Sequence, residues 1–102
     1  MSVDDRGKPR LGQLVSSRAG RDRGRYYLVY EVISERLVRV VDGIVRRVDN
    51  PKEKNTKHLS VYSATAVGVA GKLASGERVT NAEIRYAIAE LTGRGSKLHE
   101  DG

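Results

Sequence analysis

The segment 11–62 consists of short apolar and β-branched runs separated by turn residues about every 8–12 positions. The clearest run is YYLVYEVI, because aromatic and β-branched residues favour strands. Five strands over about 50 residues cannot fill a two-sheet sandwich, so we predict a small, strongly bent barrel. The predicted strands cover residues 11–17, 26–33, 36–41, 44–48 and 58–62.

Turn residues set the predicted boundaries between these strands. Asp42-Gly43 lies between two apolar runs and accepts the positive φ angles of a type I′ turn, so it predicts a tight hairpin. Asn50-Pro51 ends the strand that returns from this turn. The next residues, KEKNTK (52–57), are polar and basic, and we expect them to form a loop.

Helical spacing replaces the strand pattern after Tyr62. Residues 63–76 carry apolar side chains at helical intervals and predict a first short helix. Thr80 is a suitable N-cap for a second helix, and Glu83 completes a capping box three residues later. Gly93 is a natural end for this helix. Its predicted apolar stripe consists of Ile84, Ala87, Ile88 and Leu91.

Together these patterns predict a single, mostly β domain followed by two short C-terminal helices. We expect a flexible arm (1–10), the barrel (11–62), a helical extension (63–92) and a flexible tail (93–102). The chain has no cysteine, and no apolar run approaches the roughly 18 residues of a membrane span. The first residues include early acids and no apolar run, so we expect no signal peptide there. We therefore expect a soluble protein of the cytoplasm.

Basic charge is concentrated in the first half of the chain. Residues 1–58 contain 14 Lys and Arg residues against 8 Asp and Glu residues, whereas residues 59–102 contain 5 of each kind. Arginine outnumbers lysine by 13 to 6, and its planar guanidinium suits phosphates and base edges. A nucleic acid is therefore one predicted partner. The alternative is that the charge serves only solubility.

The loop RAGRDRGR (18–25) holds four arginines in eight residues. It lies between predicted strands, and it lacks the Lys-Ser/Thr pair and the following helix of a P-loop. Gly20 and Gly24 permit positive φ angles and a close backbone approach. Asp22 is expected to bond to neighbouring backbone amides and fix the loop. The hairpin would then hold outward Arg18, Arg21, Arg23 and Arg25.

The sequence contains no recognisable catalytic or metal-binding pattern. No serine or acid is placed at a recognised spacing from His58 or His99, the two histidines. The run AVGVAGKL (66–73) is superficially like a Walker loop but lacks its first glycine and its Ser/Thr. Gly68 and Gly71 match the bare GxxG of KH domains, but the simpler interpretation is that they let a helix pack closely on the barrel. We predict no enzyme activity, no metal and no cofactor.

The loop and its surroundings resemble the KOW motif of RNA-binding proteins. The likeness begins with the run from Gly12 to Tyr26 and continues through Val40-Val41-Asp42-Gly43, Arg46-Arg47-Val48 and Lys57-His58-Leu59. It covers about residues 10–60, roughly half of the chain. Within this group the chain is similar to the family of the fourteenth large-subunit ribosomal protein of archaea and eukaryotes. The paired short helices after residue 62 look like those of small bacterial members.

This resemblance implies a five-stranded SH3-like barrel, RNA binding through the loop between the first two strands, and no catalysis. The loop residues that match the motif are Ala19, Gly20, Arg21, Asp22 and Gly24. We expect ribosomal RNA, the large ribosomal subunit or another structured RNA to be bound by electrostatic capture and shape recognition. The complete predicted RNA-binding set is Arg18, Ala19, Gly20, Arg21, Asp22, Arg23, Gly24, Arg25, Arg46, Arg47, Lys52, Lys54 and Lys57.

Three further interpretations remain open from the sequence. Tyr26 or Tyr27 is expected to stack on an exposed base, although we expect at least one of the two in the barrel core. The module is alternatively a protein adaptor of SH3-like type, whose apolar helical face would meet a protein partner. Duplex DNA is a weaker alternative, as for any basic domain.

Overall fold

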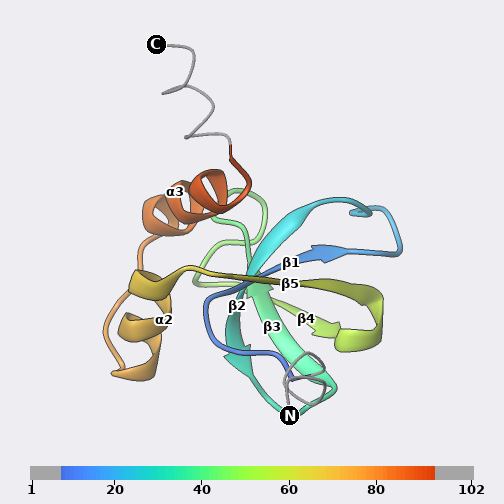
Figure 1. Cartoon of the computed structure of the whole chain (residues 1–102), viewed down its shortest axis with the longest axis horizontal. Coiled ribbons are helices and arrows are strands. Elements are labelled where there is room, and N and C mark those ends of the chain that lie inside the picture. Colours follow the sequence, from blue (N-terminus) through green and yellow to red (C-terminus); the bar gives the residue numbers. More distant parts are fainter. Residues whose placement is uncertain (1–7, 94–102) are drawn as a thin grey trace.

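The computed structural model describes residues 8–93 (Figure 1). These residues form a β-sheet followed by two α-helices, so the predicted mostly β fold with C-terminal helices is confirmed. Most of the predicted arm (1–10) and of the predicted tail (93–102) lies outside the described residues. The elements are β1 (Gln13–Ser17), β2 (Tyr26–Val32), β3 (Leu37–Val41), β4 (Lys52–Asn55), the 3-10 helix η1 (Thr56–His58), β5 (Leu59–Thr65), α2 (Val67–Ala74) and α3 (Asn81–Leu91).

The strands form one antiparallel sheet in the order β4-β3-β2-β1-β5. β5 pairs with β1 and not with β4, so these two strands are the edges of an open sheet. The predicted closed barrel is therefore not confirmed. Leu14 of β1 lies opposite Leu28 of β2, which lies opposite Val41 of β3. This register places a row of apolar side chains across the centre of the sheet.

Both faces of the sheet are buried. On one face, Leu14, Leu28 and Val41 pack with Val69 of α2 and Ile84 of α3. The second cluster, on the other face, consists of Val15, Tyr27, Val29, Val38, Val40 and Leu59. Because β2 contributes to both clusters, its sequence is an almost continuous apolar run rather than a strict alternation.

The prediction of a strand at 44–48 is wrong, and Asp42-Gly43 does not form a tight hairpin turn. The Asp42 side chain is buried and its Oδ1 atom accepts hydrogen bonds from the backbone N atoms of Ile44 (2.9 Å) and Arg46 (2.8 Å). These bonds coil the segment around the carboxylate. The apolar side chains of Ile44 and Val45 in this segment are consequently exposed to solvent.

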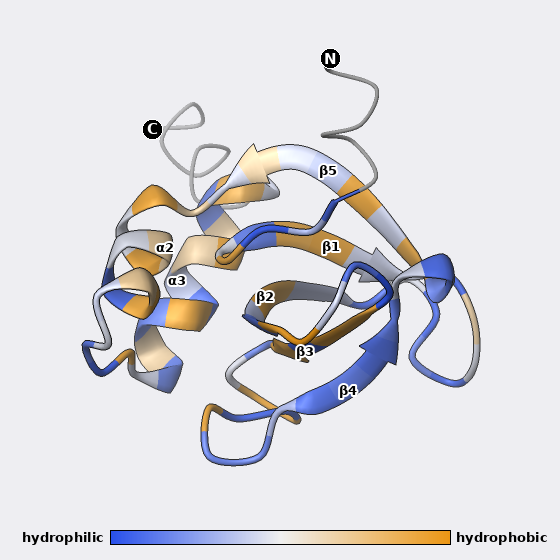
Figure 2. Ribbon diagram, turned by 90° about the horizontal axis from the view of Figure 1, so that it is seen from below, coloured by the Kyte–Doolittle hydropathy of each residue, from blue (hydrophilic) through white to orange (hydrophobic). Residues whose placement is uncertain are grey.

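The fourth strand lies instead within the predicted loop 52–57. β4 pairs with β3 in a register that places Lys54 opposite Val38 and Lys52 opposite Val40. Figure 2 shows β4 as a hydrophilic strand beside the hydrophobic β3. The sequence predicted a loop because this segment has no apolar residue. Backbone pairing stabilises the strand, and lysines are common on sheet edges because they oppose pairing with other chains.

Two glycines outside the helices let the helices approach the sheet. Gly12 has φ of 76°, and a Cβ atom there would lie 2.8 Å from the nearest atom of α2. Gly43 has φ of 79°, and a Cβ atom there would lie 2.5 Å from the backbone O of Asn81 in α3. The prediction that Gly68 and Gly71 serve close packing is wrong, because a Cβ atom at either position would meet nothing within 4 Å.

The two helices are joined to each other by an ion pair between Lys72 of α2 and Glu83 of α3. α2 is shorter than the predicted 63–76, because β5 continues through residue 65. The predicted capping box at the start of α3 is confirmed, with Thr80 and Glu83 each bonding the backbone N of the other. Gly93 follows α3 with φ of 84°, which agrees with the predicted end of this helix.

Candidate nucleic-acid interface

The segment 18–25 connects β1 to β2 as a hairpin loop, as the sequence predicts. Its base is closed by backbone hydrogen bonds from Ser17 N to Arg25 O (3.0 Å) and from Gly24 N to Ser17 O (2.8 Å). Gly20 and Gly24 have φ angles of 80° and 87°, so both provide the predicted left-handed conformation. We call residues 18–25 the basic hairpin.

The Asp22 carboxylate holds the basic hairpin from the inside. Its side chain is 12% exposed, and it accepts hydrogen bonds from the hydroxyl groups of Ser17 (2.8 Å) and Tyr27 (2.7 Å). The Nζ atoms of Lys52 and Lys54 lie 3.4 and 3.3 Å from Asp22 Oδ2. The sequence predicted backbone amides as the partners of Asp22, whereas the structure shows side chains of β1, β2 and β4.

The protonation states of this cluster follow from its contacts. Burial alone would raise the pKa of Asp22, but the hydrogen bonds from Tyr27 and Ser17 and the charge of Lys54 outweigh burial and hold the pKa well below its ordinary value. Burial and the neighbouring carboxylate both raise the pKa of the Tyr27 hydroxyl. Asp22 is therefore ionised at neutral pH while Tyr27 stays neutral and donates to it.

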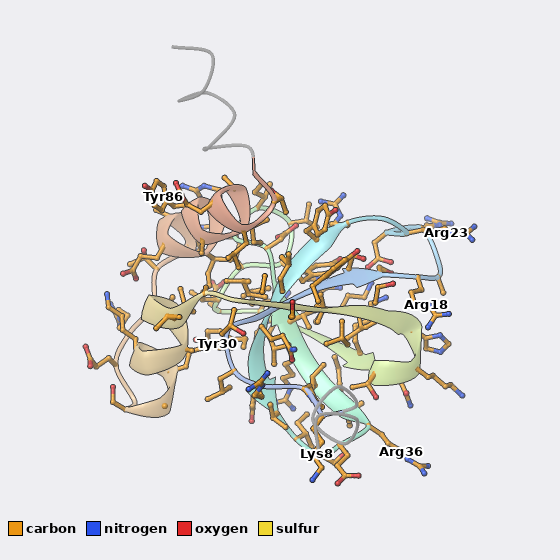
Figure 3. The ribbon with its side chains drawn as sticks, viewed as in Figure 1. Lys8, Arg18, Arg23, Tyr30, Arg36 and Tyr86 are labelled. Carbon is orange, nitrogen blue, oxygen red and sulfur yellow. The ribbon has the colours of Figure 1, made fainter. Side chains whose placement is uncertain are left out.

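The arginines at the tip of the basic hairpin lie outside this cluster. Arg18, Arg21 and Arg23 are exposed, and Figure 3 shows Arg18 and Arg23 at the end of the molecule opposite α2. The backbone N of Arg18 donates to the carbonyl O of His58 (2.8 Å), so η1 lies beside the hairpin. Lys57 of η1 is also exposed. Within residues 8–93, none of these four cations forms a salt bridge.

The lysines of β4, which the sequence placed in the same RNA-binding set, are in a different position. The Lys54 side chain is only 10% exposed, and its Nζ atom lies 3.1 Å from Ser17 Oγ and 3.3 Å from Asp22 Oδ1. Lys52 is 33% exposed and shares the same carboxylate. Asp22 thus compensates charge inside the protein, and the lysines are less available to a ligand than the hairpin arginines.

The remaining predicted arginines lie at the base of the basic hairpin (Arg25) and in the loop that follows β3 (Arg46 and Arg47), where Asp42 is a second carboxylate. Arg25 Nη1 lies 3.2 Å from Asp42 Oδ2, and the backbone N of Arg46 donates to Oδ1 of the same residue. Arg47 is exposed in the same loop, residues 42–51. Asp42 therefore joins the base of the basic hairpin to this loop.

A pocket of about 180 Å³ lies between the basic hairpin, the loop 42–51 and α3. Ile44 of the loop and Arg85, Ile88 and Ala89 of α3 were not predicted as part of the site, because no local sequence pattern shows that α3 packs beside the hairpin. Arg85, the arginine next to the apolar stripe of this helix, was the available signal. The walls include Arg25, Tyr26, Ile44, Arg85, Ile88 and Ala89.

The two tyrosines at the start of β2 have different environments. Tyr27 is 1% exposed and belongs to the core, so the expectation that at least one of the pair is buried is confirmed. Tyr26 is half-buried, lines the pocket, and has its ring centroid 5.9 Å from that of Tyr62. Tyr26 is thus the member of the pair that is accessible from the pocket.

Comparison of the chain with protein-family models and with curated proteins gives no match. The resemblance to the KOW motif therefore stays a prediction.

In the described part of the chain, no three His, Cys, Asp or Glu side chains come together as a metal site. No helix among residues 8–93 combines the length and apolar character that crossing a membrane requires.

Proposed function

We propose that this protein is a non-enzymatic RNA-binding protein of the cytoplasm that binds ribosomal or other structured RNA through the basic hairpin. The observation that carries the proposal is the separation of charges at this end of the molecule. Asp22 holds the backbone from within, while Arg18, Arg21 and Arg23 remain exposed on the outside. A rigid loop loses little conformational freedom when its arginines bind phosphates.

The proposed mechanism is electrostatic capture followed by recognition of RNA shape. The three exposed hairpin arginines and Lys57 would neutralise about four phosphates, which gives a slope on the order of −3 for log affinity against log salt. Arg25, Arg46 and Arg47 would extend the positive surface along the loop 42–51 and would contribute less to this slope than the hairpin tip, since Arg25 is already paired with Asp42. RNA helices are read mainly through backbone and shape, so sequence preference within paired regions should be modest.

We also propose that the β part is an SH3-like barrel of KOW type. Two observations support this proposal. The first and last strands of the sheet, β1 and β5, are paired neighbours. Four strands, β1, β2, β3 and β5, contribute to the cluster on the sheet face that the helices do not cover. This is the arrangement of a sheet that curves around its own core.

The test is crosslinking of the protein to RNA in its own cells, followed by sequencing of the bound RNA. The wild type is compared with the double variant Arg21→Ala, Arg23→Ala. A matched control is Lys8→Ala with Arg36→Ala, because these exposed cations lie on another side of the molecule (Figure 3). We expect reads concentrated on structured RNA, lost in the hairpin variant and kept in the control. Almost no reads from the wild type would contradict the proposal.

A protein adaptor is the second candidate function, and one observation favours it. A groove of about 390 Å³ lies between α2 and α3, and its lining includes Val67 and Tyr86, which are 79% and 70% exposed. Large exposed apolar side chains of this kind often mark protein-binding surfaces. If Tyr86→Ser abolishes function while the double hairpin variant leaves it intact, the adaptor function replaces RNA binding.

A further inference from the structure

We propose that the pocket beside the basic hairpin binds one unpaired base of the RNA, with guanine preferred. This inference rests on the proposed function, because it describes a second contact of the same RNA. The pocket begins at Gly24 and Arg25, the residues that close the hairpin. An RNA strand held by the hairpin arginines therefore passes the mouth of the pocket.

The size of the pocket selects a small ligand group. Its volume is about 180 Å³, whereas sites for complete small molecules usually measure about 300–1,000 Å³. A single base that leaves its stack is a flat, rigid group of suitable size. Proteins that recognise RNA sequence commonly take up such bases from loops and bulges.

The walls suit a base better than a phosphate. Ile44, Ile88 and Ala89 provide apolar surface, which favours an aromatic ring over a fully hydrated anion. The Asp42 carboxylate at the pocket is paired with Arg25 (3.2 Å) and offsets part of the positive charge that would attract a phosphate. Tyr26 and the guanidinium planes of arginine are groups on which bases stack.

Two arginines provide oriented donors for the edge of the base. Arg25 Nη1 is held by Asp42 Oδ2 at 3.2 Å, and Arg85 Nη1 by the backbone O of Gly43 at 2.9 Å. Each guanidinium has five donors, and within residues 8–93 only the Nη1 atom of each has a hydrogen-bond partner. Guanine offers two neighbouring acceptors, O6 and N7, which suit such donors.

The experiment measures the affinity of the protein for three RNAs with the same duplex arms. One has a single bulged guanosine, one has an abasic nucleotide at the bulge, and one is fully paired. The abasic RNA keeps the bulge in the backbone and removes only the base. We expect the guanosine bulge to bind about tenfold more tightly than the abasic bulge. Equal affinity for the two bulges would overturn the inference, and a bulged uridine that replaced the guanosine without loss of affinity would overturn the preference for guanine.

Two variants locate the effect in the pocket. Ala89→Leu fills the pocket and should remove the preference for the base without changing affinity for the paired duplex. Ala82→Leu is the matched control, because Ala82 is exposed on the same helix and does not line the pocket. Arg85→Gln provides a second test at an exposed position if the filled variant folds poorly. A preference that persists in both Ala89→Leu and Arg85→Gln would overturn the inference.

The three RNAs also separate this inference from the proposed function. The double variant Arg21→Ala, Arg23→Ala should weaken binding to all three RNAs by a similar factor. If the wild type binds the paired duplex in a salt-dependent manner but shows no preference for the base, the pocket assignment fails and RNA binding stands. If the wild type binds none of the three RNAs, both fail.

Discussion

The basic hairpin (18–25) and the loop 42–51 are two arginine-containing segments that each enclose a carboxylate, yet they are held in place in different ways. Asp22 of the hairpin accepts hydrogen bonds from side chains of the adjoining strands, such as Tyr27 at 2.7 Å. The loop depends on a helix that is remote in sequence, because Asn81 Oδ1 accepts from Val48 N at 2.8 Å. The hairpin is thus fixed by the sheet and the loop by its contact with α3.

This difference has a functional consequence. The hairpin is supported from inside and leaves its tip arginines exposed, so it can present cations without help from the helices. In the loop, by contrast, the polar side chain of Asp42 stabilises the fold. It accepts hydrogen bonds from two backbone N atoms and forms an ion pair with Arg25. Substitutions in the two segments should therefore have different effects on stability and on binding.

The largest effect is expected for Gly43→Ala. The left-handed backbone at Gly43 costs an alanine about 1–2 kcal/mol, and the new Cβ atom would lie 2.5 Å from the backbone O of Asn81. Separating α3 from the loop adds to this cost, so we expect a loss of about 3 kcal/mol or more in the free energy of unfolding. Urea denaturation measures it, and a loss below about 1 kcal/mol would show that the loop does not depend on close contact with α3.

The next largest effect is expected for Asp22→Asn. This change removes the charge that compensates the nearly buried ammonium group of Lys54, and we expect a loss of about 2 kcal/mol at neutral pH. Asp49→Asn, an exposed acid of the loop 42–51, is the control and should change stability little. Chemical denaturation of both variants provides the comparison.

The pH dependence of the same variant checks the cause. The pKa of Asp22 is lower in the folded protein than its ordinary value of 3.8. Its ionised form therefore adds stability that is complete above that value and is lost as the pH falls below it toward the folded pKa. The difference in unfolding free energy between the wild type and Asp22→Asn should shrink in strong acid. A difference that is constant with pH would show that the charge is not the cause.

A smaller effect is expected for Gly24→Ala. Gly24 has the same left-handed conformation as Gly43, with φ of 87°, but a Cβ atom there would meet nothing within 4 Å. Only the backbone penalty of about 1–2 kcal/mol should appear. Thermal and urea denaturation of Gly24→Ala beside Gly43→Ala therefore isolate the contribution of the helix contact. Equal losses in the two variants would contradict the comparison between the segments.

The smallest effect on stability is expected for Arg21→Gln with Arg23→Gln. Both side chains are exposed, so the free energy of unfolding should change by no more than about 0.5 kcal/mol. RNA affinity should nevertheless fall, because two phosphate contacts are lost. A circular dichroism melt beside an RNA titration tests both statements on the same sample. A large loss of stability would mean that these arginines support the fold.

Features with a local cause were predictable from the sequence. The glycine positions and the flanking strands predicted the basic hairpin, and Thr80 with Glu83 predicted the start of α3. The identity of the Asp22 partners was not predictable, because β4 brings Lys54 to the hairpin from 32 positions away. A strand composed of Lys, Glu and Asn carries no apolar signal, so its pairing with β3 could only be seen in the structure.

The loop 42–51 was mispredicted for the same reason. Asp-Gly between apolar runs normally forms a tight hairpin, but here Gly43 lies against α3 and Asp42 coils the next residues around its carboxylate. The pocket also depends on this packing, since Arg85 reaches Gly43 from 42 positions away. Local patterns contain no information about such contacts.

The most direct test of the central claim is the salt dependence of RNA affinity. It is measured for the wild type, for Arg21→Gln with Arg23→Gln, and for Arg46→Gln with Arg47→Gln. We predict a wild-type slope on the order of −3, a slope reduced in magnitude by about 1.5 in the hairpin variant, and a smaller reduction in the loop variant. A hairpin variant that keeps the wild-type slope would show that the basic hairpin does not contact the phosphates.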